Sequence, residues 1–460
     1  MRTLLHAAAA LLVAAPLVAQ PARQAPPAPG TPRDFSLPTV RTFQLDNGMK
    51  VTLVPFGTLP KATVQLVIRT GNYNETAEQV WLADLTGDLM QEGTATRTAG
   101  ELAQQVAGMG GSLDVVTGLE ESSIGGDVLA EFAPGMVALV ADVARNPRLP
   151  EAEVPRLKAT LARNVAQART RSQTLALERF RSAMYPNHAY GRLYPTEAML
   201  SGYTAAQARA FYDANFGAAR SHLYVAGRFD AAATEAAVRR AFADWRRGTP
   251  APTLLAQPVS RRAVYLVDRP GAVQTTLMVG LPVTNPSSPD YPALQVTNAL
   301  LGGSFGSRIT RNIRENKGYT YSPASSVSAR YRDAYWAETA DVTTDVTGAS
   351  LKEIFFEVDR LRDEPPPQEE LRGIQNYLAG TFVLQNSTPQ GIVALLRFLN
   401  LHGLERDYLE NFVRRVYAVT PQDVQRITRT YLASDKMTIV AVGDRSKITE
   451  QLAPYGTPVN

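Results

Sequence analysis

The sequence repeats itself at a spacing of 216 residues, and this repeat limits the possible folds more than any other feature. Thr204–Tyr212 resembles Thr420–Thr428, and a little further along each copy His222–Gly227 resembles Met437–Gly443. The threonines that open the first pair and the glycines that close the second pair are both 216 residues apart. In each copy a threonine precedes a helical pattern, and a β-rich run then ends at a glycine. The chain is therefore predicted to consist of two homologous halves of ordinary domain size.

Each half is predicted to begin with strands and to continue with helices. Val51–Pro55 resembles Val264–Asp268, and Ala62–Thr70 resembles Ala272–Gly280. Strands followed by helices, twice over, predict an α+β fold. The helical periods and caps predict these helices: Gln79–Gln91, Thr98–Gly108, Glu151–Gln167, Pro289–Leu301, Ser307–Asn316, Gln368–Leu384 and Gln390–Leu401.

Three segments outside the two halves are predicted to have other roles. Residues 1–19 have a short basic start, an apolar core and a small residue at the end, which is typical of a secretory signal peptide. Residues 20–39 are rich in proline and alanine and are expected to form a disordered tether. Residues 248–262 read as an extended, proline-containing linker. The two domains are therefore expected at residues 40–247 and 263–460.

Composition narrows the classes of function. The 460 residues include 47 Lys and Arg against 43 Asp and Glu, interspersed rather than in blocks, so we expect no nucleic-acid binding. No stretch after the signal peptide approaches the roughly eighteen apolar residues of a membrane span, so no transmembrane segment is expected. The chain has no cysteine, so an exported form must be stabilised by buried area rather than by disulfides. The periplasm of a Gram-negative bacterium is the expected location.

Two motifs carry a resemblance to a known family. The first half contains Trp81–Thr94, W-L-A-D-L-T-G-D-L-M-Q-E-G-T, and the second contains Leu300–Ser322, L-L-G-G-S-F-G-S-R-I-T-R-N-I-R-E-N-K-G-Y-T-Y-S. Together with the duplication, they resemble the pitrilysin or insulinase-type zinc peptidases, which include mitochondrial processing peptidase. The resemblance covers essentially residues 40–455. It implies two homologous two-layer α+β roll domains, paired to enclose a chamber.

The resemblance also implies that this chain has lost its zinc site. Active members carry H-x-x-E-H on the first motif's helix, where two histidines hold Zn²⁺ and the glutamate takes a proton from the bound water. In this frame Asp84 and Asp88 stand at the histidine positions and Gly87 at the glutamate position, while Asn164 matches a third, glutamate ligand. We therefore expect the chain to bind no metal of its own and to have no catalytic residues of its own.

The two aspartates leave one alternative open. Asp84 and Asp88, four residues apart, share a face of a helix and could hold a hard cation through their oxygens. The other interpretation is a solvated or partner-facing helix surface, because no third oxygen ligand lies nearby in the sequence.

The second motif keeps a pair of residues that active relatives use. In the family, an arginine and a tyrosine seven residues apart bind substrate and steady the oxyanion formed when water attacks the peptide carbonyl. Arg314 and Tyr321 match this pair. Guanidinium and phenol groups suit that role, because both donate hydrogen bonds that strengthen as negative charge develops. The structural alternative is that Arg314 pairs with a neighbouring acid and Tyr321 only packs on a strand.

Two further features are expected to be structural. His188, in Y-P-N-H-A-Y-G, is the kind of loop histidine that more often forms structural hydrogen bonds than binds metal. The turn around Gly302 and Gly303 resembles a phosphate-binding loop in composition only, because no Lys-Ser or Lys-Thr follows it. We expect this turn to stop one helix and to let the next begin close by.

Three functional hypotheses follow. The leading one is the non-catalytic subunit of a heterodimeric bacterial zinc peptidase, in which a homologous partner supplies H-x-x-E-H and Zn²⁺ and this chain supplies Arg314 and Tyr321 to bind unfolded peptides. The alternative is a structural or peptide-binding pseudoenzyme with no part in proteolysis. The weakest is an independent hydrolase using Asp84, Asp88 or Glu92, since no nucleophile, base and orienting residue are visible together.

Overall fold

Two mixed β-sheets, one in each half of the chain, organise the structure. The structure is a computed structural model that describes residues 36–459, so the predicted signal peptide and most of the predicted tether lie outside the described residues. The first sheet has six strands in the order β1-β2-β6-β3-β5-β4, and the second has five in the order β7-β11-β8-β10-β9. The mixture of helices and sheets confirms the predicted α+β class.

The strands and helices have the following bounds. The strands are β1 Arg41–Gln44, β2 Lys50–Pro55, β3 Lys61–Ile68, β4 Asp114–Thr117, β5 Ser122–Leu129, β6 Ser221–Gly227, β7 Ala263–Asp268, β8 Gln274–Val283, β9 Ala324–Arg330, β10 Asp333–Thr343 and β11 Thr438–Gly443. The helices of the first half are α1 Leu82–Gln91, α2 Ala99–Gly108, α3 Ala133–Arg145, α4 Val154–Arg169, α5 Ser172–Met184, α6 Glu197–Gly202, α7 Ala205–Asn215 and α8 Ala231–Phe242. Those of the second half are α9 Tyr291–Asn298, α10 Thr347–Asp363, α11 Gln368–Gln385, α12 Pro389–His402, α13 Asp407–Glu410, α14 Phe412–Ala418, α15 Pro421–Tyr431 and α16 Arg445–Leu452.

The strand pairing confirms the duplication. If β1 is left out, the two sheets have the same strand order. In both sheets the first two strands of this shared order run parallel: β2 with β6 in the first sheet, and β7 with β11 in the second. Val51 pairs with Leu223, and Val264 pairs with Ile439. Leu223 and Ile439 are 216 residues apart, so the repeat found in the sequence is also a repeat in register.

The register corrects one detail of the predicted repeat. In the first sheet Val64 pairs with Val225, and in the second Leu277 pairs with Ala441, the residue equivalent to Val225. Strand β3 therefore corresponds to β8 with Val64 opposite Leu277. The expected match of Ala62–Thr70 with Ala272–Gly280 was wrong by three residues, because apolar runs on two buried strands match almost equally well at several alignments.

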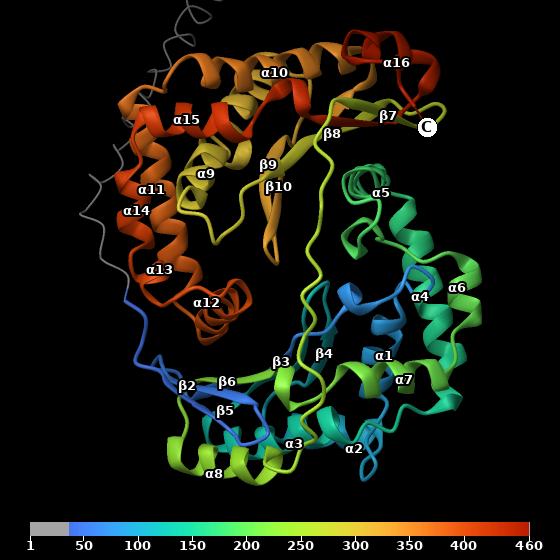
Figure 1. Ribbon diagram of the computed structural model, residues 1–460, viewed down its shortest axis with the longest axis vertical. Helices are drawn as coiled ribbons and strands as arrows, with labels where there is room; N and C mark the ends of the chain where they lie inside the picture. The colour runs from blue at the N-terminus through green and yellow to red at the C-terminus, as the bar shows by residue number, and fades with distance from the viewer. Residues whose placement is uncertain (1–35, 460) are drawn as a thin grey trace, which may run out of the picture. The chain divides into compact units, whose positions relative to one another are not determined.

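Each half lends a helix to the sheet of the other half. Helix α5 of the first half packs on β8 and β11, and α12 of the second half packs on β3 and β6 (Figure 1). The other faces are covered from within the same half, by α3 on the first sheet and by α10 and α16 on the second. Strands β6 and β11 are buried along their whole length because helices cover both of their faces. Through this exchange the two halves form one compact unit across the described residues.

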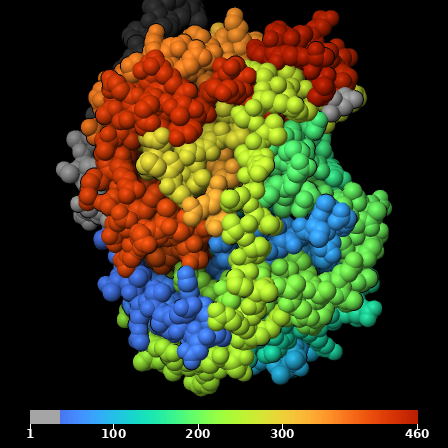
Figure 2. Space-filling view, in the orientation of Figure 1, coloured from blue at the N-terminus to red at the C-terminus, as the bar shows by residue number. Residues whose placement is uncertain are grey.

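The linker between the halves is extended, whereas the end of the predicted tether before the first half is packed against the core. Residues 247–262 contain no helix or strand and run in an extended path from one half to the other, visible along one face in Figure 2. Leu37, near the end of the predicted tether, is buried in the hydrophobic core that the second half forms together with part of the first sheet. Packed chain therefore begins a few residues before Val40, the expected start. No helix within residues 36–459 is long and apolar enough to cross a membrane.

The helices agree with their predicted ranges to within a few residues, with one difference in type. The Thr98–Glu101 capping box at the start of α2 is present as predicted. The helices predicted at Pro289–Leu301 and Ser307–Asn316 instead end in wider π-type turns, at residues 299–303 and 310–316. Such turns often occur at functional sites. The second turn contains Arg314, and Gly302 and Gly303 of the first line the same pocket as Arg314.

Candidate functional site

Helix α1, which carries the positions equivalent to the zinc ligands, is capped by a carboxylate from the loop before it. Trp81, at the helix start, has a left-handed φ of 68° and gives no side-chain cap. Glu75 takes this role: its two oxygens accept hydrogen bonds from the Trp81 N–H at 3.1 Å and the Ala83 N–H at 2.8 Å. The first amide groups of the helix are thereby satisfied.

Asp84 is tied to the same loop. The Asn72 amide donates to Asp84 Oδ2 at 2.6 Å and to Glu75 Oε1 at 3.2 Å. Burial raises the pKa of Glu75 to about 8 and that of Asp84 to about 6, in each case against the hydrogen bonds that favour ionisation. Near pH 7 the two carboxyl groups therefore carry roughly one negative charge between them. Asp84 holds the loop against α1 and does not point at a free coordination position.

The position of the missing catalytic glutamate is filled by a neighbouring strand. A Cβ atom on Gly87 would lie 2.5 Å from Thr117 Oγ1 and 3.6 Å from the nearest Val115 methyl group, both on β4. The Thr117 hydroxyl donates to the Ala83 carbonyl of the helix at 3.3 Å. A carboxylate at position 87 therefore does not fit unless the Thr117 side chain or β4 itself moves away from α1.

The remaining two positions of the degenerate site are also unsuited to a metal. Asp88 is half-buried, and burial raises its pKa, with the neighbouring Glu92 adding to the effect and Arg156 opposing it. Glu92 is itself paired with Arg156 of α4. Asn164, also on α4, is exposed, and no hydrogen bond joins its side chain to another residue of the described chain.

The donor set on α1 and α4 does not fit Zn²⁺. Asp84 is engaged by Asn72, Gly87 offers no donor, and Asn164 is exposed to solvent. Across residues 36–459, no three His, Cys, Asp or Glu side chains meet closely enough to hold a metal ion. The hard-cation alternative for Asp84 and Asp88 gains no third ligand from the fold.

His188 has the structural role predicted for it. Its Nδ1 accepts a hydrogen bond from the Tyr190 N–H at 3.2 Å, and its Nε2 lies 3.3 Å from the Leu254 carbonyl oxygen. The first bond assigns the proton to Nε2, which then donates to Leu254. The ring therefore fixes the linker to the first half.

In the second half, close packing explains the glycines of the turn after α9. A Cβ on Gly302 would lie 2.5 Å from both Ser325 Oγ and Glu338 Oε2, and one on Gly303 would lie 2.4 Å from Asn298 Nδ2. The turn ends at Gly303, and the next helical segment starts five residues later. This confirms the prediction that the turn stops one helix and lets the next begin nearby.

Arg314 and Tyr321 lie side by side next to this turn. The Arg314 guanidinium carbon is 5.1 Å from the centroid of the Tyr321 ring and 4.4 Å from that of Phe305, so the cation lies between two aromatic rings. Arg314 Nη1 also lies 3.5 Å from Glu315 Oε1, as the structural alternative proposed. The other part of that alternative is wrong, because Tyr321 does not pack on a strand: it precedes β9 and is 79% exposed.

The backbone on both sides of the pair is held in place. The Asn312 amide donates to Glu353 at 3.0 Å and Glu357 at 2.8 Å, which ties the arginine's helical segment to α10. The Tyr319 N–H donates to the Ile313 carbonyl at 2.8 Å, and the Thr320 hydroxyl donates to the Asp341 carbonyl at 2.7 Å. The side chains of the pair are thus accessible while their main chain is anchored.

The pair lines a pocket of about 320 Å³ made of one chain segment. Its lining residues all lie between Gly302 and Ala324, and they include no residue of α1 or α4. The fold thus brings Arg314 and Tyr321 together but does not bring them to Asp84, Gly87, Asp88 or Asn164 of the same chain.

Sequence reasoning missed two residues of this site. Phe305 is 74% exposed and supplies the second ring on Arg314, and an aromatic residue in a glycine-rich turn was a visible signal of it. Glu338 lies behind Gly302, with its side chain fully buried and no hydrogen-bond partner for either oxygen among the described residues. Nothing in the sequence indicates this, because Glu338 lies in a strand where charged residues usually face solvent.

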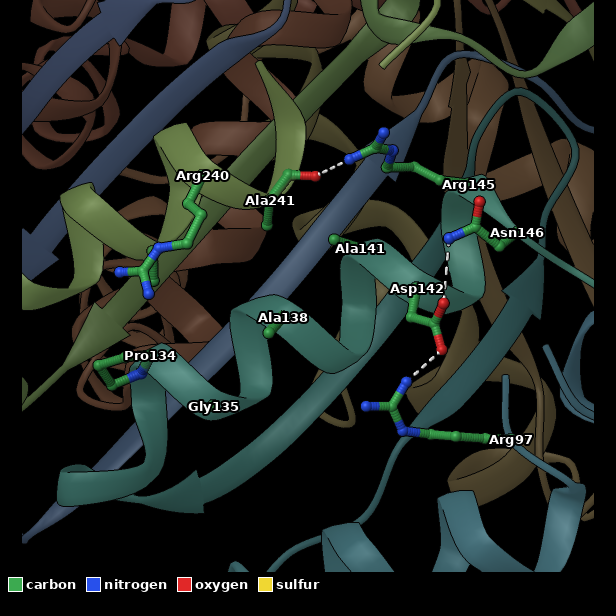
Figure 3. Close-up of a pocket in the computed structure, with 11 residues that line it drawn as sticks. Arg97, Pro134, Gly135, Ala138, Ala141, Asp142, Arg145, Asn146, Arg240 and Ala241 are labelled. Atoms are coloured by element: carbon green, nitrogen blue, oxygen red, sulfur yellow. Dashed lines mark hydrogen bonds and ion pairs between the residues drawn. The ribbon is translucent and has the colours of Figure 1, made fainter. Parts of the chain in front are cut away.

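A separate cavity of about 500 Å³ lies between α3 and α8, remote in sequence from both sets of residues. Figure 3 shows its polar contacts: Arg97 and Asn146 meet Asp142, at 2.6 and 3.0 Å, and Arg145 donates to the Ala241 carbonyl. These groups satisfy one another, and the wall between them is mostly alanine and glycine. The cavity offers no nucleophile or acid–base pair.

Comparison with known proteins identifies the family. Residues 55–195 match the sequence model described as insulinase, peptidase family M16, and residues 202–378 match the model described as the peptidase M16 inactive domain. The chain belongs to the insulinase (M16) peptidase family. The inactive-domain match contains Arg314 and Tyr321, and the insulinase match contains α1 and α4.

Bacterial relatives of this insulinase-family chain are named as zinc proteases. An uncharacterized zinc protease of Mycobacterium bovis is 25% identical over 415 residues, which cover 85% of this chain and 91% of the relative. One from Streptomyces coelicolor is 22% identical over 408 residues, covering 87% and 88%. One from Rickettsia felis is 23% identical over 331 residues, covering 72% and 80%.

Two solved structures share the fold. A protein described as a peptidase M16 inactive domain, from Pseudomonas fluorescens, superposes with a TM-score of 0.82 at 23% identity, covering 88% of this chain and 98% of that one. A protease from Helicobacter pylori gives 0.81 at 17% identity, covering 89% and 100%. The predicted architecture of two insulinase-type domains is thereby confirmed.

Proposed function

We propose that this insulinase-family chain is the non-catalytic subunit of a heterodimeric bacterial zinc peptidase. A homologous partner carries H-x-x-E-H and Zn²⁺, and this chain contributes Arg314 and Tyr321 to the shared site. The substrates are unfolded peptides. The observation that carries the proposal is the contrast between the two halves: the pair is assembled and accessible in the second, whereas the metal positions of the first are closed by Thr117 and Asn72.

The exposure of the site supports a role at an interface with another molecule. Tyr321 and Phe305 are 79% and 74% exposed, although both are aromatic. Large exposed aromatic side chains beside a pocket are typical of surfaces that bind a partner or peptide. The pocket contains no acid or base from α1, so the chemistry of water activation has to come from elsewhere.

The roles of the two side chains follow from their donors. The Arg314 guanidinium offers several N–H groups in a fixed plane, and the Tyr321 hydroxyl offers one more at a different reach. Both can donate to a peptide carbonyl oxygen and donate more strongly as that oxygen becomes an oxyanion. The stacking of Arg314 between two rings limits its motion and so lowers the entropy lost when peptide binds. Zn²⁺ in the partner would polarise the water and the carbonyl.

We also propose that the chain is exported to the periplasm. The support is the amino-terminal sequence at residues 1–19, with its basic start and apolar core. An extracytoplasmic peptidase subunit without disulfides relies on buried area, and the exchanged helices α5 and α12 contribute buried residues to it.

The test is hydrolysis of a fluorogenic unstructured peptide by the mature chain, by its H-x-x-E-H homologue from the same organism, and by the two mixed, each with and without chelator. We expect activity in the mixture to exceed that of the homologue alone and to be lost with chelator. If the chain neither works alone nor changes the activity of its homologue, it is instead a structural or peptide-binding pseudoenzyme. Chelator-sensitive activity of the chain alone would contradict the account of the lost zinc site.

A further inference from the structure

A charged cavity that shares no lining residue with the Arg314 pocket lies where the end of the first sheet meets α12. It has a volume of about 250 Å³. Its lining includes Lys50 of β2, Arg69 after β3, Glu121 before β5, Arg220 and His222 around the start of β6, and Asn400 of α12. The two sequence-distant arginines are held together by the backbone, because the Arg69 N–H donates to the Arg220 carbonyl at 2.9 Å.

Glu121 is buried in this cavity with one oxygen unused. Its side chain is only 8% exposed, and its Oε2 lies 3.3 Å from Arg397 Nη2 of α12. Its Oε1 has no hydrogen-bond partner among residues 36–459. Burial raises the pKa of Glu121, while Arg397 and Arg69 oppose this effect. A buried acceptor of this kind usually has a partner, because leaving it without one costs about 1–3 kcal/mol.

Arg69 is the complementary group. Its guanidinium carbon lies 4.6 Å from the centroid of the Tyr331 ring, and its Nε is buried without a hydrogen-bond partner in the described chain. No ion pair within 4.0 Å joins Arg69 to Glu121 or to another acid of the described residues. Arg220, in contrast, is satisfied by the linker, since it donates to the Thr249 carbonyl at 2.9 Å and hydroxyl at 2.7 Å.

Lys50 completes the positive side of the cavity. It is exposed, and its side chain has no hydrogen bond or ion pair with another described residue. Burial, reinforced by Lys50, lowers the pKa of His222 to about 3, so this ring stays neutral. The charges available to a ligand are therefore two unpaired cations, Lys50 and Arg69, beside one unused oxygen of Glu121.

A second cavity of about 470 Å³ adjoins the charged one. The two share Gln44, Lys50, His222 and Asn400 as lining residues. The second cavity has a mixed lining: leucines of α12 and of the loop after it (Leu396, Leu399 and Leu404) form its apolar part, and Glu405 and Arg406 add charged groups. A ligand with a charged end in the first cavity can therefore place an apolar group in the second.

We propose that these joined cavities bind an amino-acid carboxylate with an apolar side chain. The carboxylate is held by Lys50 and Arg69, the N–H beside it donates to Glu121 Oε1, and the apolar side chain lies against the leucines. At roughly 30 Å³ per water, the charged cavity has room for about eight waters, which is more than the backbone atoms of one amino acid occupy. Two sources share this chemistry, a free hydrophobic amino acid and the C-terminal residue of a peptide. The site does not depend on Arg314, Tyr321 or a partner subunit.

Isothermal titration calorimetry of the mature chain tests the proposal with four probes: N-acetyl-Ala-Ala-Leu, its C-terminal amide, N-acetyl-Ala-Ala-Asp and free leucine. We expect the leucine acid to bind at least 10-fold more tightly than its amide and than the aspartate peptide. Tight binding of free leucine with weak binding of the peptide acid assigns the site to free amino acids, and the reverse assigns it to peptide C-termini. Binding of neither probe, or equal binding of acid and amide, would overturn the proposal.

Four variants locate the binding. Lys50→Gln changes an exposed side chain with no partner, so this variant is expected to fold normally. Lys50→Gln and Arg69→Gln, each as a single variant, should weaken binding of the leucine peptide acid by about 10-fold. Arg240→Gln, an exposed arginine on α8 without a partner in the described chain, is the matched control and should bind as the wild type does. Arg314→Gln should also leave this affinity unchanged. Unchanged affinity in both Lys50→Gln and Arg69→Gln would show that the ligand binds elsewhere, whatever the outcome of the hydrolysis test.

Discussion

The guanidinium carbon of Arg314 lies 5.1 Å from the centroid of the Tyr321 ring, and the two side chains face one pocket although six residues of helix end and loop separate them. The wide helical turn that ends at Asn316 and the hydrogen bond from the Tyr319 N–H to the Ile313 carbonyl fold the chain back to produce this contact. The pair is therefore a property of the fold of the second half and needs no contribution from the first.

Gly87 and Thr117 should show strong energetic coupling. An alanine in a helix interior is favoured over glycine by about 1 kcal/mol, but a Cβ at position 87 overlaps Thr117 Oγ1, which we expect to cost about 1–3 kcal/mol. Gly87→Ala should therefore not stabilise the wild type. In the background of Thr117→Ala it should stabilise by about 1 kcal/mol, measured by urea denaturation.

Gly380 provides the matched control for this cycle. It lies inside α11, and a Cβ there would meet nothing within 4 Å. Gly380→Ala should raise the free energy of unfolding by about 1 kcal/mol in either background. Additive effects of Gly87→Ala and Thr117→Ala would show that β4 does not close the former catalytic position.

Glu338 should make the protein less stable as pH rises. Its complete burial raises its pKa well above the usual range. The folded state therefore keeps a proton that the unfolded state releases above a pKa of about 4.3, so stability falls as pH rises from there through the folded-state pKa. Glu338→Gln removes this titration. The free energy of unfolding of the variant minus that of the wild type should grow by at least about 1.4 kcal/mol between pH 4.5 and pH 8.

The control for Glu338 is Glu78→Gln, an exposed glutamate in the loop before α1. Its difference from the wild type should stay constant over the same pH range. A constant difference for Glu338→Gln as well would mean that Glu338 finds a partner or solvent when folded.

The exchange of helices between the halves should contribute much of the stability. Phe180 of α5 is fully buried, and its ring approaches Gly280 of β8, where a Cβ would lie 2.9 Å from the ring edge. Phe180→Ala should lower the free energy of unfolding by about 3–5 kcal/mol. Phe356→Ala, at a 52% exposed position on α10, should change it by no more than about 0.5 kcal/mol. Similar small effects at both positions would argue against a shared interface.

The start of the exported protein gives a test of the proposed location. The small residue Ala19 precedes Gln20 at the end of the apolar segment. Intact-mass measurement of protein recovered from the periplasm should give a chain that begins at Gln20. A full-length chain recovered only from the cytoplasm would contradict export.

Local patterns predicted much of the fold because they report local physics. The caps at Thr98 and Thr204 and the central strands β6 and β11 lie where the sequence placed them. The exchange of α5 and α12 had no such signal, since an apolar helix face does not reveal which sheet it covers. The three-residue error in matching β3 to β8 has the same cause: only long-range pairing fixes the register of a buried strand.

The candidate site was predictable in part. The spacing of Arg314 and Tyr321 located the pair, but their contact depends on a π-type turn that propensities do not indicate. The frame around Asp84 and Gly87 identified the lost zinc site. The sequence did not indicate that Asn72, from the loop before α1, and Thr117, from β4, close that site, because these contacts form only in the folded chain.

The central claim is that Arg314 and Tyr321 act on peptide held by a partner's metal site, and the most direct measurement is kcat/KM of the reconstituted complex for an unstructured peptide. Arg314→Gln and Tyr321→Phe should each lower it, the arginine variant by about 10²-fold. Arg415→Gln removes an arginine that likewise has an acid and an aromatic neighbour, and Tyr377→Phe changes a half-exposed tyrosine on α11. Both controls should leave kcat/KM unchanged. If the Arg314 and Tyr321 variants matched these controls, the pair would have no role in hydrolysis and the proposed composite site would be wrong.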